Sequence, residues 1–319
     1  MTLYDLIIIG GGPAGSAAAV YAARKKLKTL FITTEFGGQS IVSDQIYNWI
    51  GTTSLSGQEL ANNLKKHVLA NAGDTLTVIE NQKVENISKD LEGAPDGGAS
   101  KSFFSITTGA QEKFFTKTIL ITTGSGRRKI KAINADRLEH KGLTYCASCD
   151  GPIFADMDVA VIGGGNAGFE TAAQLLAYCK SVTLINNNDS FQADPITVEK
   201  VLQNQKMHTI KNADILEIQG EKFVEGIIYE DKISKEKKEL EISGIFVEIG
   251  QIPNTNLVKD LVPLDTYNRI IIDPSTQKTK IPGIWAAGDC TDVLYHQNNI
   301  AAGDAVRALE DIYLTLNIK

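Results

Sequence analysis

The sequence is poor in the residues from which disulfide scaffolds and metal clusters are built. Its 319 residues include only four cysteines and four histidines, whereas small secreted scaffolds and zinc modules are dense in them. Basic residues are not in excess either, since 32 Lys and Arg face 38 Asp and Glu, a net charge of −6. Acidic chains bind nucleic acids and anionic membranes poorly, so neither is expected as a partner.

The chain also lacks an apolar run that could cross a membrane. The best candidate, residues 6–23, is uncharged but contains Gly-Gly-Gly-Pro and follows Asp5 rather than a basic segment. It therefore fits neither a membrane span nor a signal peptide. With no export signal, we expect a cytoplasmic protein, and structural disulfides are rare in that compartment.

What the chain does have is a repeated order of strand, glycine turn, helix and strand. The length suits two ordinary domains, and the two copies start about 150 residues apart, as expected for two βαβ dinucleotide folds. The expected segments of the two copies are residues 4–9, 10–15, 15–25 and 29–33, then 159–162, 163–168, 169–178 and 181–185.

Alternating apolar and polar residues predict strands after each copy, over 75–123 and 209–248. The first stretch holds a loop over 89–101, and the second a charged hairpin around 234–240, which we interpret as a solvated turn. Residues 283–319 predict a strand, a Gly-Asp turn and a final helix.

The first glycine turn, 10–15, is a G-x-G-x-x-G motif between a strand and a helix. The first glycine makes the turn, the second lets a pyrophosphate approach the backbone, and the third lets helix and strand pack closely. Glu35 lies 20 residues beyond Gly15, where a carboxylate binds a ribose hydroxyl. A glycine turn without a ligand is the alternative, and this context disfavours it.

The second turn, 163–168, has the same glycines but a different residue after the next strand. Asn186 stands where an acid favours NADH, and no arginine follows that would hold the 2′-phosphate of NADPH. An amide still binds a ribose hydroxyl, although more weakly than a charged group does. The candidate residues of this less certain site are Gly163, Gly165, Asn166, Ala167, Gly168 and Asn186.

Two cysteines stand at C-x-x-C spacing, Cys146 and Cys149, and Asp150 follows them. Half a zinc site has this pattern, but no second cysteine or histidine cluster accompanies it, so no metal is expected. A reversible disulfide is the better interpretation. Asp150 is then a turn residue, a helix cap or a proton donor to a leaving thiolate. Cys179 and Cys290 are isolated and are expected to be buried or lone thiols.

The order of these motifs resembles the low-molecular-weight thioredoxin reductases over essentially the whole chain. The C-x-x-C precedes the second glycine turn, whereas the glutathione-reductase type carries its redox cysteines early in the first domain. The matching segments are GGGPAG at 10–15, GGQ at 37–39, YNW around Asn48, TTG at 122–124, CASCDGP at 146–152, GGGNAGFE at 163–170, IGQIPNT at 249–255, GIWAAGD at 283–289 and AAGDAVRAL at 301–309.

Several stretches, such as KGLTYC and CDGPIF, are especially similar to the flavoprotein component of alkyl hydroperoxide reductase. That component carries additional N-terminal thioredoxin-like domains. Because this chain starts directly at the first dinucleotide fold, a stand-alone reductase is expected.

The resemblance implies an α/β fold with two Rossmann-like domains of the three-layer ββα type, the smaller inserted in the larger. Residues 1–126 and 250–319 would form the FAD-binding domain, and 127–249 the NAD(P)-binding-like domain with the redox cysteines. The residues implied for FAD are Gly10, Gly12, Pro13, Ala14, Gly15, Glu35, Gly37, Gly38, Gln39, Asn48, Val84, Thr123, Gly124, Gly288, Asp289, Gln297 and Asn298.

The implied activity is FAD-dependent disulfide reduction. Cys149 would face the flavin, Cys146 would attack an external disulfide, and Asp150 would protonate the leaving thiolate. The implied acceptor is a thioredoxin-like protein, and the implied assembly is a homodimer.

The electron donor stays open at this point. NADH or NADPH can serve, but the family's NADPH-selecting arginines are missing from 186–192. A pyridine-nucleotide-independent flavoprotein, either a ferredoxin-linked reductase or a dithiol oxidase, is therefore the alternative. The basic segment 127–131, Arg-Arg-Lys-Ile-Lys, and Arg137 are either a solvated linker or a docking patch for an acidic redox protein.

Overall fold

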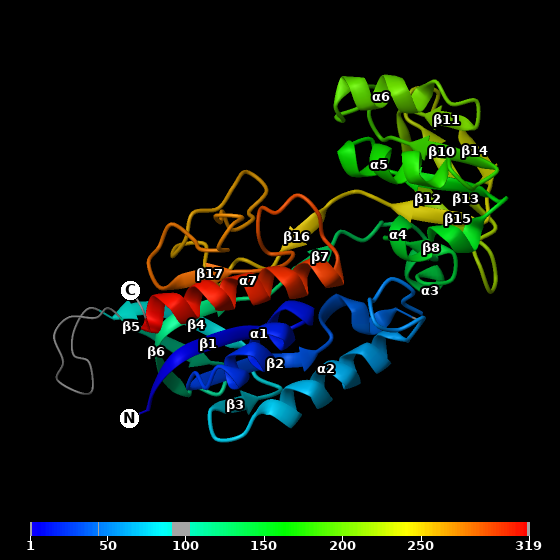
Figure 1. The fold of residues 1–319 in the computed structure, drawn as a ribbon. Coiled ribbons are helices and arrows are strands. Elements are labelled where there is room, and N and C mark those ends of the chain that lie inside the picture. Colours follow the sequence, from blue (N-terminus) through cyan, green and yellow to red (C-terminus); the bar gives the residue numbers. More distant parts are fainter. Residues whose placement is uncertain (1, 44, 91–102, 318–319) are drawn as a thin grey trace. The chain divides into compact units, whose positions relative to one another are not determined.

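The computed structural model describes residues 2–43, 45–90 and 103–317, and it divides into two compact units. The first combines Met1–Gly126 with Ile252–Lys319, and the second is Arg127–Gln251 (Figure 1). The expected loop over 89–101 falls almost entirely outside the described residues. Each unit is described by itself below.

The first unit is built on a mostly parallel sheet in the order β3-β2-β1-β6, in which β17 also pairs with β6. β17 pairs with the C-terminal part of β6, whereas β5 pairs antiparallel with the N-terminal part of β6 and β4 pairs antiparallel with β5. Its elements are β1 (Leu3–Gly11), α1 (Pro13–Arg24), β2 (Thr29–Phe36), a 3-10 turn (Gly38–Val42), α2 (Gly57–Asn71), β3 (Leu76–Ile79), β4 (Val84–Asp90), β5 (Phe103–Thr108), β6 (Lys113–Ile121), β17 (Ile284–Ala286) and α7 (Asn298–Asn317).

Both faces of this sheet are covered, which explains why β1 is a continuous apolar run. Leu6 and Ile8 belong to a core shared with α1, α2 and α7, while Ile7 and Ile9 belong to a core shared with β4, β5 and the segment 257–272. The alanine-rich helix α1 lies against α7, because small side chains allow a close approach (Figure 1).

The second unit repeats this plan with a parallel sheet in the order β11-β10-β9-β15-β8 and a separate antiparallel sheet, β12-β13-β14. Its elements are α3 (Ala135–Leu138), β8 (Leu143–Thr144), α4 (Ala147–Asp150), a 3-10 turn (Gly151–Phe154), β9 (Asp158–Ile162), α5 (Asn166–Leu175), β10 (Ser181–Ile185), α6 (Pro195–Leu202), β11 (Met207–Ile210), β12 (Ala213–Gln219), β13 (Gly226–Asp231), β14 (Lys237–Glu241) and β15 (Gly244–Val247).

Alternation along β9 again divides two cores. Val159 and Val161 pack with α5 and α6, whereas Ala160 and Ile162 pack with the antiparallel sheet. Helices, parallel sheet and antiparallel sheet thus form three layers, and the predicted α/β fold of Rossmann-like ββα type is confirmed. Two short strands, β7 (Ser125–Arg127) and β16 (Gln251–Pro253), pair where the chain passes from one unit to the other.

Candidate functional site

The first glycine turn joins β1 to α1, and Gly10 and Gly15 occupy positions in it that no larger residue fits. Gly10 has a φ of +113°, and a Cβ there would lie 2.4 Å from the carbonyl oxygen of Thr122. A Cβ on Gly15 would lie 1.8 Å from the oxygen of Gly10. Contacts this short are impossible for a real side chain, so the glycines allow α1 to begin directly against the end of the sheet.

The start of α1 offers an anion site. Gly12 is the N-cap and supplies no side-chain cap, and Pro13 follows at the first helical position. A Cβ on Gly12 would meet nothing within 4 Å, so the space in front of the helix is open. The first backbone N–H groups of a helix have no intrahelical partner and favour a negative charge. A pyrophosphate therefore fits here.

Gly288 brings a second helix to the same place. A Cβ on Gly288 would lie 3.2 Å from the Cβ of Ala301 in α7 and 3.4 Å from that of Ala14 in α1. The half-buried Asp289 follows in the same turn. The starts of α1 and α7 and a carboxylate thus surround one place at the sheet edge, as the sequence predicts for the pyrophosphate and ribityl parts of FAD.

Glu35 is exposed near the end of β2, and only its backbone is used by the turn. Its carbonyl oxygen accepts a 2.6 Å hydrogen bond from Thr33 Oγ1, and a Cβ on Gly11 would lie 2.2 Å from that same oxygen. The strand end therefore lies against the glycine turn while the Glu35 carboxylate stays at the surface, where it can accept hydrogen bonds from ribose hydroxyl groups.

Gly37 and Gly38 continue the chain from β2 with φ values of +92° and +57°. The N–H of Gly37 donates to the oxygen of Gly11 at 2.9 Å, which holds this turn against the first. Gln39 donates through Nε2 to the oxygen of Ser125. The GGQ segment therefore lies beside both the glycine turn and the strand that follows β6.

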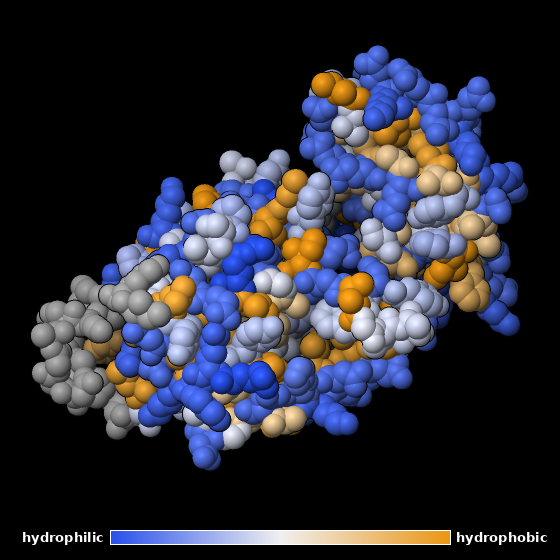
Figure 2. Space-filling view, in the orientation of Figure 1, coloured by the Kyte–Doolittle hydropathy of each residue, from blue (hydrophilic) through white to orange (hydrophobic). Residues whose placement is uncertain are grey.

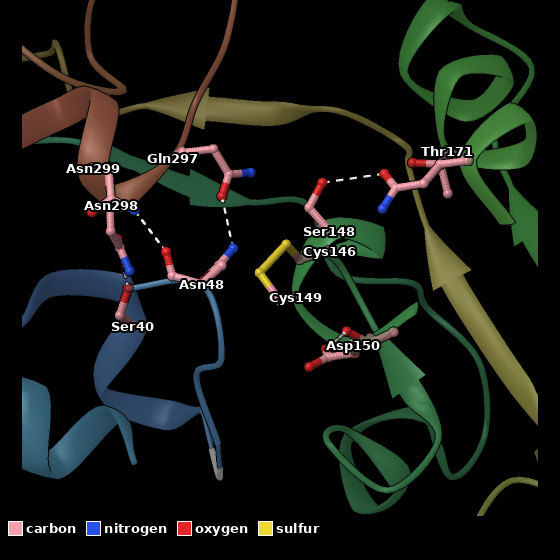
Figure 3. Close-up of a disulfide and its surroundings, with 12 residues drawn as sticks. Ser40, Asn48, Cys146, Ser148, Cys149, Asp150, Thr171, Gln297, Asn298 and Asn299 are labelled. Carbon is pink, nitrogen blue, oxygen red and sulfur yellow. Dashed lines mark hydrogen bonds between the residues drawn. A yellow bond between two sulfur atoms is a disulfide. The ribbon is translucent and has the colours of Figure 1, made fainter. Parts of the chain in front are cut away.

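Asn48 connects two segments that are far apart in the sequence. Its Nδ2 donates to Gln297 Oε1 at 3.1 Å, and its oxygen accepts from Asn299 Nδ2 at 2.7 Å. Asn298, the first residue of α7, accepts from Ser40 Oγ at 2.9 Å. Figure 3 shows the Asn48 and Gln297 amides pointing toward one another. The predicted residues Asn48, Gln297 and Asn298 are thus brought together around the start of α7.

Two further predicted residues follow β6. Thr123 Oγ1 donates to the Asn254 oxygen at 2.8 Å, and Asn254 Nδ2 donates back to the Thr123 oxygen at 3.0 Å. Gly124 has a φ of +63°. Val84, by contrast, begins β4 with its side chain buried in the core, so only its backbone is available to a ligand. The FAD contacts of all these residues stay predictions.

The second glycine turn reproduces the first. Gly163 has a φ of +130°, and a Cβ there would lie 2.2 Å from the Glu248 oxygen. A Cβ on Gly168 would lie 2.0 Å from the Gly163 oxygen, while Gly165, the N-cap of α5, has open space around it. Asn166 and Ala167 start α5, as Pro13 and Ala14 start α1. This backbone fits a second pyrophosphate.

Cys146 and Cys149 are bonded to each other at the start of α4, and both are half-buried. Cys146 is the N-cap of that short helix, and its carbonyl oxygen accepts from the N–H groups of Cys149 and Asp150 at 3.2 and 3.0 Å. Figure 3 shows the disulfide and Asp150 on this helix. The pair is therefore presented on a tight turn rather than in the core.

Neighbouring side chains hold this turn in place. Thr144 Oγ1 donates to Asp150 Oδ2, and Ser148 Oγ donates to Gln174 Oε1 of α5 at 3.2 Å. Gly151 leaves room for Tyr178, because a Cβ there would lie 2.1 Å from the tyrosine oxygen. Asp150 thus follows the disulfide directly at the end of α4, with its carboxylate accepting from Thr144.

The comparisons with known proteins decide the family. Residues 4–305 match the pyridine nucleotide-disulphide oxidoreductase family. The chain belongs to this family. The F component of alkyl hydroperoxide reductase from Escherichia coli is 38% identical and an NADH dehydrogenase of Bacillus subtilis 35% identical, each over 96% of this chain. The chain spans 57% of the length of these two curated relatives.

Solved thioredoxin reductases have the same fold as this pyridine nucleotide-disulphide oxidoreductase. That of Streptococcus pyogenes is 31% identical with a TM-score of 0.87, and each chain covers 98% of the other. That of Giardia duodenalis is 27% identical with a TM-score of 0.89, covering 99% of this chain and all of the other. The predicted family and enzyme class are therefore confirmed, and the family implies FAD as the cofactor with NADH or NADPH as electron donor. The electron donor of this chain stays a prediction.

The other two cysteines of this oxidoreductase are fully buried, and burial raises the pKa of each thiol to about 11. Cys290 Sγ donates to the oxygens of Ala287 and Ile121 at 3.5 and 3.7 Å. Burial therefore disfavours the reactive thiolate form of both cysteines. Among the described residues, no group of three or more His, Cys, Asp or Glu could hold a metal ion, and no helix is long and apolar enough to cross a membrane.

Sequence reasoning missed Glu248, which follows β15 beside the second glycine turn. Its Oε1 accepts from Thr171 Oγ1 at 2.9 Å. Burial raises the pKa of this carboxyl to about 7, and Glu170 adds to the rise, while the Thr171 bond and Arg127 oppose it. No motif signals such a residue, because its burial depends on how the strand end meets the turn.

The basic stretch after Gly126 is largely engaged within its own unit. The Arg127 guanidinium lies 5.4 Å from the centre of the Tyr145 ring, and Lys129 forms a 2.5 Å ion pair with Glu139. Arg137 donates to the oxygens of Gly220 and Glu221. These contacts favour the solvated-linker interpretation over a docking patch.

Proposed function

We propose that this chain is an FAD-dependent disulfide reductase that delivers electrons through the Cys146–Cys149 pair to a protein disulfide. The observation that carries the proposal is the bonded pair on a half-buried turn with Asp150 beside it, in a unit that also holds a dinucleotide turn. A binding module without redox activity would have no need of such a pair.

The first unit would be the FAD domain and the second the NAD(P)-like domain, with predicted limits 1–126 and 250–319 against 127–249. The helix starts at Gly12 and Asn298, together with Glu35 and Asp289, would hold the FAD pyrophosphate, ribose and ribityl groups. Bound FAD supplies a two-electron carrier that a nicotinamide can reduce and a disulfide can oxidise.

The cysteines then carry out disulfide exchange. Two electrons and two protons convert the Cys146–Cys149 disulfide into two thiols. The Cys146 thiolate attacks the partner's disulfide and forms a mixed disulfide, and one partner sulfur leaves as a thiolate, which Asp150 protonates. The Cys149 thiolate then attacks Cys146, which restores the internal disulfide and releases the partner with two thiols.

The partner class follows from the relatives. Thioredoxin reductases act on thioredoxin, and the relatives named as alkyl hydroperoxide reductase components point to a peroxide-reducing system. We therefore propose a thioredoxin-like protein as the acceptor, which would serve a thioredoxin or a peroxiredoxin pathway. The cytoplasmic location stays a prediction.

A homodimer is proposed from an apolar groove on the first unit. It has a volume of about 270 Å³ and lies along the outer face of α1, between α2 and α7. Tyr21 is 40% exposed there. Figure 2 shows that apolar side chains are otherwise scattered over a mostly hydrophilic face. Tyr21→Glu should convert a dimer into a monomer in light scattering, while Ile233→Glu, a 79% exposed position of the other unit, should not.

The decisive experiment for the activity uses the FAD-loaded protein and a thioredoxin. Cys149→Ser should keep FAD bound yet lose thioredoxin reduction by at least about a thousandfold. Cys290→Ser is the matched control, because that thiol is buried and is not used. Substantial thioredoxin reduction by Cys149→Ser would refute the mechanism.

A second candidate is a reductase or dithiol oxidase that uses no pyridine nucleotide, with reduced ferredoxin as one donor. The absence of a charged residue at Asn186 is the observation that favours it. Anaerobic titration separates the two candidates. Loss of oxidised flavin absorbance on adding NADH or NADPH supports the first, and loss only with dithionite or reduced ferredoxin supports the second.

A further inference from the structure

The side chain of Asn186 is held in one orientation by its own loop. The residue directly follows β10 and is only 5% exposed. Its Nδ2 donates to the carbonyl oxygens of Asn188 and Ser190 at 2.8 and 3.0 Å. A primary amide has two N–H donors, so both are used to close the loop over 186–190, and neither is available to a ligand.

The opposite side of the amide faces the second glycine turn. A Cβ on Gly164 would lie 2.6 Å from Asn186 Oδ1, so the missing side chain of Gly164 makes room for this oxygen. Oδ1 accepts no hydrogen bond from the part of the chain that the structure describes. Asn186 therefore presents an acceptor, and no donor, to the place where the adenosine ribose of a dinucleotide lies in this fold.

We propose that Asn186 Oδ1 selects a dinucleotide with a free 2′-hydroxyl, so that NADH and not NADPH is the nucleotide of this chain. A hydroxyl donates a hydrogen bond to such an acceptor, whereas a 2′-phosphate at neutral pH brings negative oxygens and has little or no O–H with which to donate one. The inference deepens the proposed function and rests on its pyridine-nucleotide site.

The charges around the loop do not replace the missing arginines. The loop's own Asp189 adds a negative charge, which accepts from Asn212 Nδ2 at 3.3 Å. Lys232 Nζ donates to the Asn187 oxygen at 3.0 Å and lies 3.7 Å from Asp214. Lys232 is therefore already engaged by a carbonyl oxygen and a carboxylate.

Lys211 is the remaining cation. Its Nζ lies 4.8 Å from the centre of the Phe191 ring, and the ring packs edge-on against Phe169. A single exposed lysine on an aromatic face does not supply the bidentate grip that arginines give to a phosphate. Lys211 is nevertheless the side chain that a 2′-phosphate would use, so it enters the test.

The test measures binding without turnover, by calorimetry of NAD⁺ and NADP⁺ with the oxidised, FAD-loaded protein. NAD⁺ should bind at least about tenfold more tightly than NADP⁺. Asn186→Ala should weaken NAD⁺ binding about tenfold and leave NADP⁺ binding nearly unchanged. Asn187→Ala is the matched control, because its exposed side chain makes no hydrogen bond with the described residues, and it should change neither.

Asn186→Asp separates ligand recognition from loop closure, because it keeps the acceptor and loses both loop donors. It should retain the NAD⁺ preference. Equal losses of NAD⁺ and NADP⁺ in Asn186→Ala, or loss of the preference in Asn186→Asp, would overturn the proposal. So would NADP⁺ binding that is tighter than NAD⁺ binding and disappears in Lys211→Ala. If neither nucleotide binds while the dithionite-reduced protein still reduces thioredoxin, the inference fails and disulfide reduction stands.

Discussion

The two glycine turns of this chain have the same backbone and different surroundings. In both, the last glycine lies under the first, with Cβ clashes of 1.8 Å at Gly15 and 2.0 Å at Gly168. In both, the N-cap glycine faces open space. A pyrophosphate site of this kind is formed by backbone N–H groups. The glycine motif alone is therefore enough to give both turns the same backbone shape, whatever nucleotide each turn binds.

The residues predicted to contact each ribose come from the ends of neighbouring strands, and there the two turns differ. Glu35 leaves its carboxylate at the surface, while Asn186 turns its amide inward. The residue whose carbonyl oxygen packs against the first glycine of the turn also differs. It is Thr122 against Gly10 in one unit and Glu248 against Gly163 in the other. Binding a dinucleotide and choosing one are therefore separable properties, set by different parts of the sequence.

The largest expected effect comes from adding one methyl group to each turn. Gly15→Ala should abolish FAD binding, because the helix must move away from the strand to relieve its clash. Gly168→Ala should leave FAD bound and weaken NAD⁺ binding at least about a hundredfold. FAD content by absorbance and NAD⁺ affinity by calorimetry check the pair.

Gly109→Ala is the control for these substitutions. It lies in an exposed turn where the nearest atom to a Cβ is a Glu85 side-chain oxygen at 3.4 Å, so both ligands should bind as in the wild type. If Gly168→Ala released FAD as readily as Gly15→Ala, the two turns would not serve separate nucleotides.

The next effect tests Glu248, the acid present only at the second turn. Its raised pKa means that folding favours the protonated form, so its contribution to stability is complete below the ordinary pKa of 4.5 and is lost as the pH rises through about 7. Glu248→Gln should therefore gain stability relative to wild type as the pH rises. The difference in unfolding free energy between variant and wild type should be larger at pH 8 than at pH 4.5 by roughly 2 kcal/mol, allowing for partial exposure.

Urea unfolding at several pH values measures this difference. Glu241→Gln, on the exposed strand β14, is the control and should show no such trend. A stability difference between wild type and Glu248→Gln that does not change from pH 4.5 to pH 8 would show that the carboxyl is not desolvated.

The features of the fold and the site that could be predicted are those set by residues close together in the sequence. Gly10 and Gly163 could be placed because positive φ and close approach are properties of glycine itself. The Cys146–Cys149 pairing could be anticipated because three-residue spacing on one turn brings the sulfurs together. Both are local consequences of the sequence.

The direction of a side chain is not local in this sense. The Asn186 amide is oriented by two carbonyl oxygens further along its loop, and Gly151 is needed because Tyr178, beyond α5, packs over it. The sequence predicts only that Asn186 binds a ribose hydroxyl more weakly than a carboxylate would, through either its N–H donors or its oxygen. The structure leaves it only an acceptor, and that difference turns an open choice of electron donor into a specific proposal.

The smallest effect concerns Glu35, the counterpart of Asn186 at the first turn. Glu35→Gln keeps an acceptor oxygen and removes the charge, so FAD should dissociate about tenfold more readily, equivalent to about 1.4 kcal/mol. Thr34→Ala, the exposed neighbour on β2, should change nothing. Equal FAD affinity in Glu35→Gln and wild type would mean that charge is not needed to read a ribose here. The neutral amide of Asn186 would then bind a ribose hydroxyl as well as a carboxylate does. What distinguishes Asn186 would be only the direction in which its oxygen points.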